Sequence, residues 1–234
     1  MPDIILIETS TSLCTTALVR DGKIVCTRES KEARSQAAMT APFVKEMLEE
    51  AGIGVSDCDA VCVSAGPGSY TGLRVGVSTA KGLCFASGIP LISVNTLEIL
   101  VHQAISEGLV PEGCKHIIPM IDARRMEVYA AVFSRDEAGR FVQSEEISPV
   151  VVDAASFKKE REEGKVLFIG DAAGKCEPLL AGDNCVFVQT NPRAEAMLAP
   201  ALKAFKEKRF ESTAYFEPFY LKQFVATVSK KNVL

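Results

Sequence analysis

The chain has 234 residues, 47% of them hydrophobic, and a formal net charge of -4. This is enough to bury the core of one large domain or of two small lobes, and the acidic balance argues against a stand-alone RNA-binding protein. No apolar stretch approaches the roughly 20 residues that span a bilayer, and the start MPDIILIETS lacks the features of a signal peptide. We therefore expect a cytoplasmic protein without a membrane segment.

The first half of the chain predicts three strands followed by alternating helices and strands. Hydrophobic periodicity and the Asp21-Gly22 turn predict strands at 4–9, 13–20, 23–29, 59–65 and 90–94. One helix is expected around residues 43–52, where Pro42 lies either in the first turn or at a kink in a longer helix. A further helix is expected after SAGPGSYTG up to about residue 87, and another from 95 to about 107. The order is βββαβαβα.

The second half predicts the same order again. Strands are expected at 116–122, 126–133, 141–147, 165–170 and 184–188, and helices at 153–164, 172–181 and 193–208. The repetition favours an α/β protein of two lobes that meet at a cleft, an N-terminal lobe over 1–107 and a C-terminal lobe over 108–234. The helix at 193–208 has the alternative of packing back on the N-terminal lobe.

The common cofactor motifs are absent. The eight cysteines include no CxxC pair, which favours buried thiols over a zinc cluster. The glycines in SAGPGSYTG are spaced one residue too widely for a dinucleotide-binding fingerprint, and GDAAGKC at 170–176 departs from a P-loop in spacing and in Cys176. For His102 and His116 the context favours structural roles.

The first candidate site is the end of the first strand. Glu8, Thr9 and Ser10 bring a carboxylate and hydroxyls to a strand end, the kind of oxygen ligands that suit magnesium and phosphate in a nucleotide site. The alternative, which the residues alone favour, is a turn whose hydroxyls bond its own backbone.

The second candidate is the turn IDARRME. Asp122, Arg124 and Arg125 could face the cleft and hold an anion, or form a solvated hairpin tip, and the sequence leaves both open.

The helix after SAGPGSYTG has small residues on one face. Gly72, Gly76 and Ala80 are four residues apart, so they share a face where another backbone can approach closely, from a partner or from the same chain. Each glycine costs a helix about 1 kcal/mol relative to alanine, so it needs a packing reason. Arg74 and Lys81 lie on a neighbouring stripe, where they could meet an acidic partner.

Three segments together resemble the TsaB (YeaZ) family. They are IETSTSLCTTALV, SAGPGSYTGLRVGVSTAKGLCFASGIPLISVNTLEIL and IDARRMEVYAAVF, and PFYLK at 218–222 is similar as well. The resemblance implies the two-lobed actin-like ATPase fold (ASKHA, RNase H-like), in agreement with the duplicated βββαβαβα pattern. It also implies a subunit required for N6-threonylcarbamoyladenosine at position 37 of tRNAs reading ANN codons.

The resemblance implies that the chemistry lies in partner subunits. The family works with the catalytic TsaD and the ATPase TsaE, and TsaD carries two metal-binding histidines in VNHLEGH. The matching stretch here is VNTLEIL, with Thr96 and Leu100 at the histidine positions, and neither residue type is a good metal ligand. We therefore expect no metal or other cofactor in this chain, with ATP and a metal ion in the partners. Glu8 replaces the usual Asp, which argues against nucleotide binding, and Arg34 replaces a frequent His without an assigned role.

The leading hypothesis is a non-catalytic partner of TsaD, which contacts tRNA through the complex and could form a homodimer when alone. The interface is expected on the helix after SAGPGSYTG, and Gly76→Arg is expected to abolish TsaD binding while the fold is retained. Its predicted residues are Gly72, Leu73, Arg74, Gly76, Val77, Ala80 and Lys81.

Two other functions remain as alternatives. The first is an active ATP-dependent kinase or ATPase of the same fold, and the second is a metallopeptidase, against which the missing histidines speak. Lys230 and Lys231 in the tail could touch tRNA, but a solvated terminus is the preferred interpretation.

Overall fold

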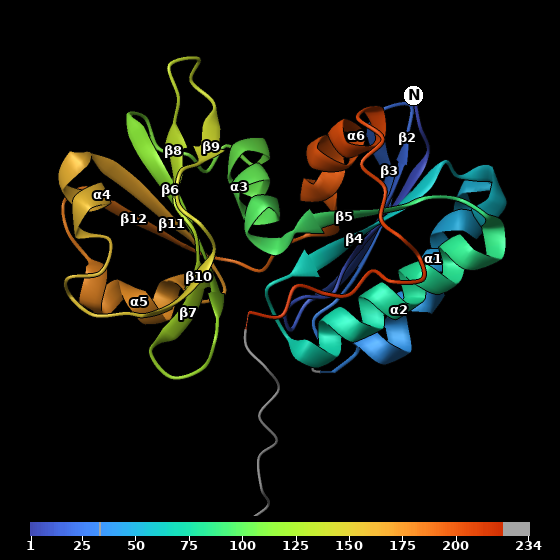
Figure 1. The fold of residues 1–234 in the computed structure, drawn as a ribbon, viewed down its shortest axis with the longest axis horizontal. Coiled ribbons are helices and arrows are strands. Elements are labelled where there is room, and N and C mark those ends of the chain that lie inside the picture. Colours follow the sequence, from blue (N-terminus) through green and yellow to red (C-terminus); the bar gives the residue numbers. More distant parts are fainter. Residues whose placement is uncertain (33, 222–234) are drawn as a thin grey trace, which may run out of the picture.

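The computed structural model describes residues 1–32 and 34–221 and has two lobes, each built on one sheet (Figure 1). The tail with Lys230 and Lys231 therefore lies outside the described residues. The first sheet has the strand order β3-β2-β1-β4-β5. Its strands are β1 (Ile4–Glu8), β2 (Cys14–Arg20), β3 (Lys23–Ser30), β4 (Ala60–Gly66) and β5 (Leu91–Asn95).

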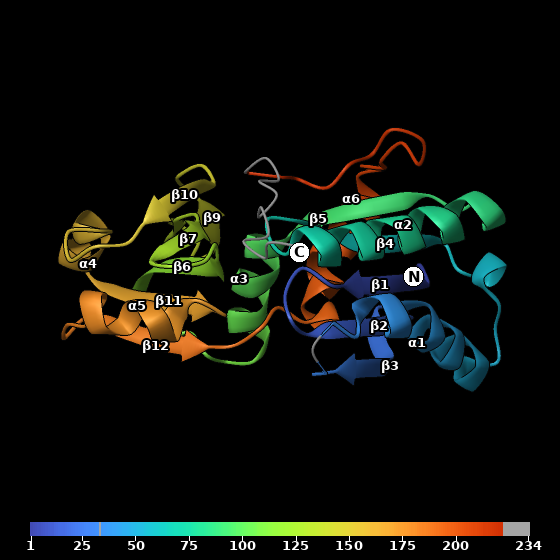
Figure 2. The same cartoon turned by 90° about the horizontal axis from the view of Figure 1, so that it is seen from below.

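Helices cover both faces of this sheet, which is why every residue of β1 is buried. One face carries α1 (Gln36–Ala51), the 3-10 turn η1 (Val55–Asp57) and α2 (Tyr70–Ser87), the nearer layer in Figure 2. The sequence left open whether Pro42 lies in the first turn of a short helix or inside a longer one. α1 is the longer helix, with Pro42 inside it. The Ser69 hydroxyl caps α2 by accepting a hydrogen bond from the Gly72 amide.

The second sheet has the order β10-β7-β6-β11-β12, and β8 joins it beside β6 and pairs with β9. Its strands are β6 (Cys114–Asp122), β7 (Glu127–Ala130), β8 (Phe133–Arg135), β9 (Phe141–Gln143), β10 (Ser148–Val151), β11 (Lys165–Gly170) and β12 (Cys185–Gln189). Two helices belong to this lobe, α4 (Lys158–Glu163) and α5 (Ala173–Leu180). Between the sheets lies α3 (Thr96–Ser106) (Figure 1).

The second lobe departs from the predicted elements in four respects. The strand expected at 126–133 is two strands, because β7 pairs with β10 whereas β8 pairs with β9. The strand expected at 141–147 ends at Gln143, and β10 was not predicted. The helix expected at 153–164 begins only at Lys158, after Phe157 in the left-handed conformation (φ 54). An apolar run does not show where its pairing partner changes, since that partner comes from elsewhere in the chain.

After β12 the chain returns to the first lobe. The 3-10 turn η2 (Ala194–Met197) and α6 (Leu198–Lys206) pack on the first sheet, where Met197 and Ala201 share a core with Ile4 and Leu6. Together with α3 they cover the face opposite α1 and α2.

A final segment, residues 211–221, follows as the C-terminal strap, drawn in red in Figure 1. It begins beside β5, where the Glu211 amide donates to the Leu91 carbonyl (2.8 Å), and reaches the end of β4, where the Phe219 amide donates to the Ala65 carbonyl (2.7 Å). Within the described residues, no helix has both the length and the apolar character needed to cross a membrane.

Candidate functional site

The small residues of α2 pack inside the chain. A Cβ built on Gly72 would lie 2.1 Å from the Thr9 carbonyl oxygen, and one on Gly76 would lie 2.3 Å from the Thr9 hydroxyl. That hydroxyl donates to the Gly72 carbonyl (2.8 Å), and Ala80 is fully buried. The glycines thus admit the turn after β1. The prediction that this strip is small for another protein's backbone is wrong, because a segment of the same chain already occupies it.

The other predicted interface residues are also engaged by their own chain. Leu73 and Val77 are buried in the core. Lys81 Nζ donates to the carbonyls of Ala214 (3.2 Å) and Phe216 (3.1 Å) in the C-terminal strap. Arg74 lies over the Tyr70 ring, 4.3 Å from its centroid, and a hydrogen bond to Tyr220 of the strap raises the pKa of Arg74. The two cations, expected to meet an acidic partner, hold the strap instead.

The outward face of α2 presents a second stripe of small residues that sequence reasoning missed. Ser78, Gly82 and Ala86 are four residues apart and exposed, and a Cβ on Gly82 would meet nothing within 4 Å. Beside them Phe85 is 87% exposed. Ala37, Ala38 and Ala41 on the neighbouring α1 are exposed as well. The four-residue spacing of these small residues is visible in the sequence, but the sequence does not show that they face solvent. We call Ser78, Gly82, Phe85 and Ala86, with these three alanines, the outer helix face.

Glu8 lies fully buried at the end of β1. Its Oε1 accepts from the Ser10 amide (2.5 Å). Among residues 1–32 and 34–221, its Oε2 and the Ser10 hydroxyl have no hydrogen-bond partner. Burial raises the pKa of Glu8 to about 7, although the hydrogen bond from the Ser10 amide lowers it, and the charge of Asp171 from the second lobe raises it further. The carboxyl is therefore largely neutral at pH 6 and below.

The surroundings of Glu8 do not fit a nucleotide phosphate. The Thr9 amide donates to the Ser64 hydroxyl (3.4 Å), and the Ser69 amide donates to the Ser10 carbonyl (2.6 Å). A Cβ on Gly68 would lie 2.3 Å from that same carbonyl. The amides of Thr9, Ser10 and Ser69 are thus used within the chain, and the small Gly68 lets the turn after β1 approach closely. The Thr9 hydroxyl bonds α2 and not its own turn, whereas Thr11 Oγ1 accepts from the Leu13 amide (3.4 Å), as in the alternative of a turn that bonds its own backbone.

Thr96 and Leu100, the positions that the family resemblance matches to metal-binding histidines, are both buried. Leu100 lies in the core between α3 and the second sheet, with Ile121 and Ile169. Thr96 begins α3. Within the part of the chain that the structure describes, no group of three or more His, Cys, Asp or Glu side chains is placed to hold a metal ion.

The Asp122 turn is fastened to α5. Lys175 Nζ forms an ion pair with Asp122 and donates to the carbonyls of Arg125 (2.9 Å) and Glu127 (2.7 Å). The Asp122 amide donates to Asp171 Oδ1 (2.8 Å), and burial raises the pKa of Asp171 to about 6. Arg124 and Arg125 are exposed. Asp122 is thus neutralised by Lys175, a residue that sequence reasoning did not select, and only the two arginines remain available to an anion.

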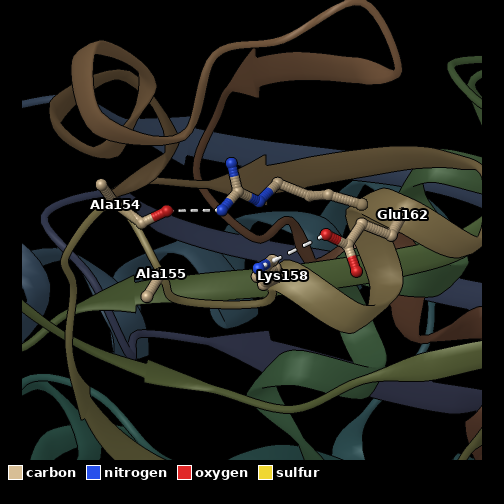
Figure 3. Close-up of a pocket in the computed structure, with 5 residues that line it drawn as sticks. Ala154, Ala155, Lys158 and Glu162 are labelled. Carbon is tan, nitrogen blue, oxygen red and sulfur yellow. Dashed lines mark hydrogen bonds and ion pairs between the residues drawn. The ribbon is translucent and has the colours of Figure 1, made fainter.

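A surface pocket of about 450 Å³ lies far along the second lobe, against α4 (Figure 3). Its lining is Ala154, Ala155, Lys158, Arg161 and Glu162. Lys158 pairs with Glu162 (3.6 Å), and Arg161 Nη2 donates to the Ala154 carbonyl (2.6 Å). The pocket shares no residue with the candidate sites, and Arg161 Nε has no hydrogen-bond partner among the described residues.

Comparisons with known proteins agree with this architecture. A family model described as "TsaD: tRNA N6-adenosine threonylcarbamoyltransferase" matches residues 30–228. The chain is 30% identical over 234 residues to the tRNA threonylcarbamoyladenosine biosynthesis protein TsaB of Escherichia coli (strain K12), covering 95% of this chain and 96% of that protein. The chain belongs to the TsaB family.

Further relatives fit the same assignment. The TsaB protein of Haemophilus influenzae is 28% identical, over 94% of this chain and 93% of its own. The solved structure of YeaZ from Pseudomonas aeruginosa superposes with a TM-score of 0.82 at 26% identity, over 94% of this chain and 100% of that one. The predicted TsaB-family membership and the two-lobed, actin-like α/β fold are confirmed.

Proposed function

We propose that this TsaB-family chain is a non-catalytic subunit in the formation of N6-threonylcarbamoyladenosine at position 37 of tRNAs reading ANN codons. In this proposal it binds and activates a TsaD-type catalytic subunit and works with a TsaE-type ATPase. The E. coli relative, 30% identical, is called a tRNA threonylcarbamoyladenosine biosynthesis protein. The chemistry belongs to the partners, which supply ATP binding and a metal ion.

The observation that carries the proposal is the outer helix face. Phe85 is 87% exposed on a regular helix whose Ser78, Gly82 and Ala86 are exposed as well, and the neighbouring helix α1 exposes three alanines of its own. Exposed aromatic side chains near small residues mark surfaces where helices of another protein pack closely. Burial of such apolar faces drives association, and without the partner the same face would pair two copies of this chain about a two-fold axis.

The cleft supports a non-catalytic role. The amides of Ser10 and Ser69 beside Glu8 bond within the chain, and Leu100, at a position matched to a TsaD histidine, lies in the core. The alternative of an active kinase or ATPase would need a phosphate cradle at this place. We therefore assign the interface to the outer helix face, in place of the buried strip of Gly72, Gly76 and Ala80.

The test is a pull-down with the TsaD homologue of the same organism. Gly82→Arg adds a large charged side chain at an exposed helical position that has open space around it. It should raise helix propensity by about 1 kcal/mol and lower recovery of the partner at least tenfold. Ala138→Arg, at an exposed hairpin tip in the second lobe, is the matched control. Undiminished recovery with Gly82→Arg would remove the outer helix face from the interface.

The functional arm measures the modified base. Cells depleted of this chain should lose N6-threonylcarbamoyladenosine from tRNA, and wild type and Ala138→Arg should restore it while Gly82→Arg should not. Normal levels of the modified base after depletion would contradict the proposed function itself.

A further inference from the structure

The turn between β6 and β7 holds two arginines in an uncommon backbone conformation. Arg124 has φ 71 and Arg125 has φ 51, so two successive non-glycine residues are left-handed. Residues other than glycine adopt this conformation at a cost in free energy, and such positions cluster at functional sites. Glycine or asparagine is the usual choice in a tight hairpin turn. Two arginines at these positions therefore suggest that their side chains have a function.

The turn is held rigidly from outside. Lys175 on α5 fastens it at Asp122 and at the carbonyls of Arg125 and Glu127. The Arg124 amide donates to Asp122 Oδ1 (2.8 Å), and the Glu127 amide donates to the Arg124 carbonyl (3.1 Å). These contacts fix the backbone and neutralise the nearby aspartate.

The side chains of Arg124 and Arg125 are free. Both residues are exposed, and within residues 1–32 and 34–221 neither guanidinium has a hydrogen-bond or ion-pair partner. Other arginines of the chain do pair with carboxylates, namely Arg20, Arg28, Arg140, Arg193 and Arg209. On a chain of net charge -4, a rigid turn thus presents two adjacent positive groups to solvent.

We propose that this turn binds backbone phosphates of RNA, with Arg124 and Arg125 as the phosphate-binding residues and Lys175 as a positioning residue. The proposal rests on the proposed function, because a tRNA-modifying assembly has to hold its RNA. The planar guanidinium matches phosphate oxygens with two parallel hydrogen bonds. Such contacts fix the position of a nucleic acid without reading its sequence.

The placement of the turn favours an extended ligand over a small one. The turn lies at the lower edge of the second lobe in Figure 1, on the side of the molecule where α2 begins in the first lobe. Exposed side chains on such an edge suit a long polyanion that runs past the molecule. The direct contact adds to the contacts that the partner subunits make.

The experiment measures binding of a tRNA transcript with an ANN-reading anticodon to the full chain, alone and in complex with its TsaD-type partner. Fluorescence anisotropy at several salt concentrations gives affinity and salt slope. Arg124→Glu/Arg125→Glu should weaken binding at least tenfold. Each lost phosphate contact should reduce the slope of log K against log salt by about 0.7 to 0.9. The loss of both contacts should therefore reduce the slope by about 1.5. Lys158→Glu/Lys159→Glu makes the same charge change on α4 and should stay within about twofold of wild type.

A second variant separates the lost contact from a lost fold. Arg124→Gly/Arg125→Gly removes both guanidiniums and places glycine where φ is positive, which glycine adopts freely. Its thermal unfolding midpoint should equal or exceed that of wild type, while its tRNA affinity should fall. Recovery of the partner in the pull-down should be unchanged, so failure of this inference leaves the proposed function standing.

Three results would overturn the inference. One is unchanged affinity and salt slope in both Arg124/Arg125 double variants. Another is an equal loss in the Lys158/Lys159 control, which would indicate general electrostatics. The last is weakened binding of ATP without any change for tRNA, which would make the turn a nucleotide site.

Discussion

At the scale of single residues, the main feature is the carboxyl group of Glu8, which lies in the protein interior, where carboxyl groups are rare. Glu8 is wholly buried and one of its oxygens has no partner among the described residues. Burial of a carboxylate without a counter-ion disfavours its charged form, which is why its pKa rises to about 7. Folding is therefore coupled to protonation of the Glu8 carboxyl.

The sign of the pH dependence follows from the two states. Unfolded Glu8 titrates near 4.5, and the folded group near 7. Stability is full below pH 4.5, where both states are protonated, and it declines as pH rises toward 7, because only the unfolded state ionises over that range. The shift corresponds to about 3 kcal/mol.

We expect Glu8→Gln to remove this dependence, because glutamine does not ionise. In urea unfolding, the variant should gain about 2–3 kcal/mol over wild type between pH 5 and pH 8. If the difference in unfolding free energy between variant and wild type stays constant across this pH range, Glu8 does not cause the pH dependence.

At the scale of elements, α2 has two opposite stripes of small residues with different purposes. The inner stripe admits the turn after β1 to within hydrogen-bonding distance. The outer stripe has open space in front of it at Gly82. The helix thus has a close contact within the chain on one side and an exposed surface on the other.

Two alanine substitutions on this one helix should act in opposite directions. Gly72→Ala places a Cβ 2.1 Å from a backbone oxygen, and we expect a loss of about 1–3 kcal/mol from overpacking. Gly82→Ala meets nothing and should add up to about 1 kcal/mol of stability through helix propensity. Both are measured by chemical denaturation, and equal effects at the two sites would contradict the distinction between the stripes.

By the same reasoning, Gly76→Arg does not test the interface. A side chain at Gly76 would begin 2.3 Å from the Thr9 hydroxyl. The variant should fail to fold, so the expectation of a retained fold is withdrawn in favour of Gly82→Arg.

At the scale of the whole molecule, the chain crosses between lobes twice, and one side chain braces the second crossing. Gln103 on α3 is buried; its Nε2 donates to the Thr190 hydroxyl (3.1 Å), and its Oε1 accepts from the Arg193 amide (3.1 Å). Just beyond, the Ala194 amide donates to the Thr15 hydroxyl (2.9 Å). These bonds tie the return segment to both α3 and the first sheet.

Gln103→Met keeps the side-chain volume but leaves the Arg193 amide without its acceptor. We expect a loss of about 1–3 kcal/mol, the cost of an unsatisfied buried polar group. Gln143→Met, on the exposed strand β9, should change stability by less than about 0.5 kcal/mol. An unchanged denaturation midpoint for Gln103→Met would show that the crossing is held by other contacts.

Local patterns predicted most elements of the first lobe correctly. The apolar spacing of Phe43, Val44, Met47 and Leu48 predicted the buried face of α1, and all four are buried. The second lobe was predicted less well, since the break between β7 and β8 falls inside one continuous apolar run.

The sequence by itself determined the family, the two-lobed alternation of strands and helices, and the absence of common cofactor motifs, because these depend on residue order and on periodicity along one segment. Only the tertiary structure decided which stripe of α2 faces inward, that Arg74 and Lys81 hold the C-terminal strap, and that Lys175 fastens the Asp122 turn. Lys81 contacts residues more than 130 positions away. The physical reason is that each of these features is a contact between distant segments, whose partner is not written in the local pattern of either.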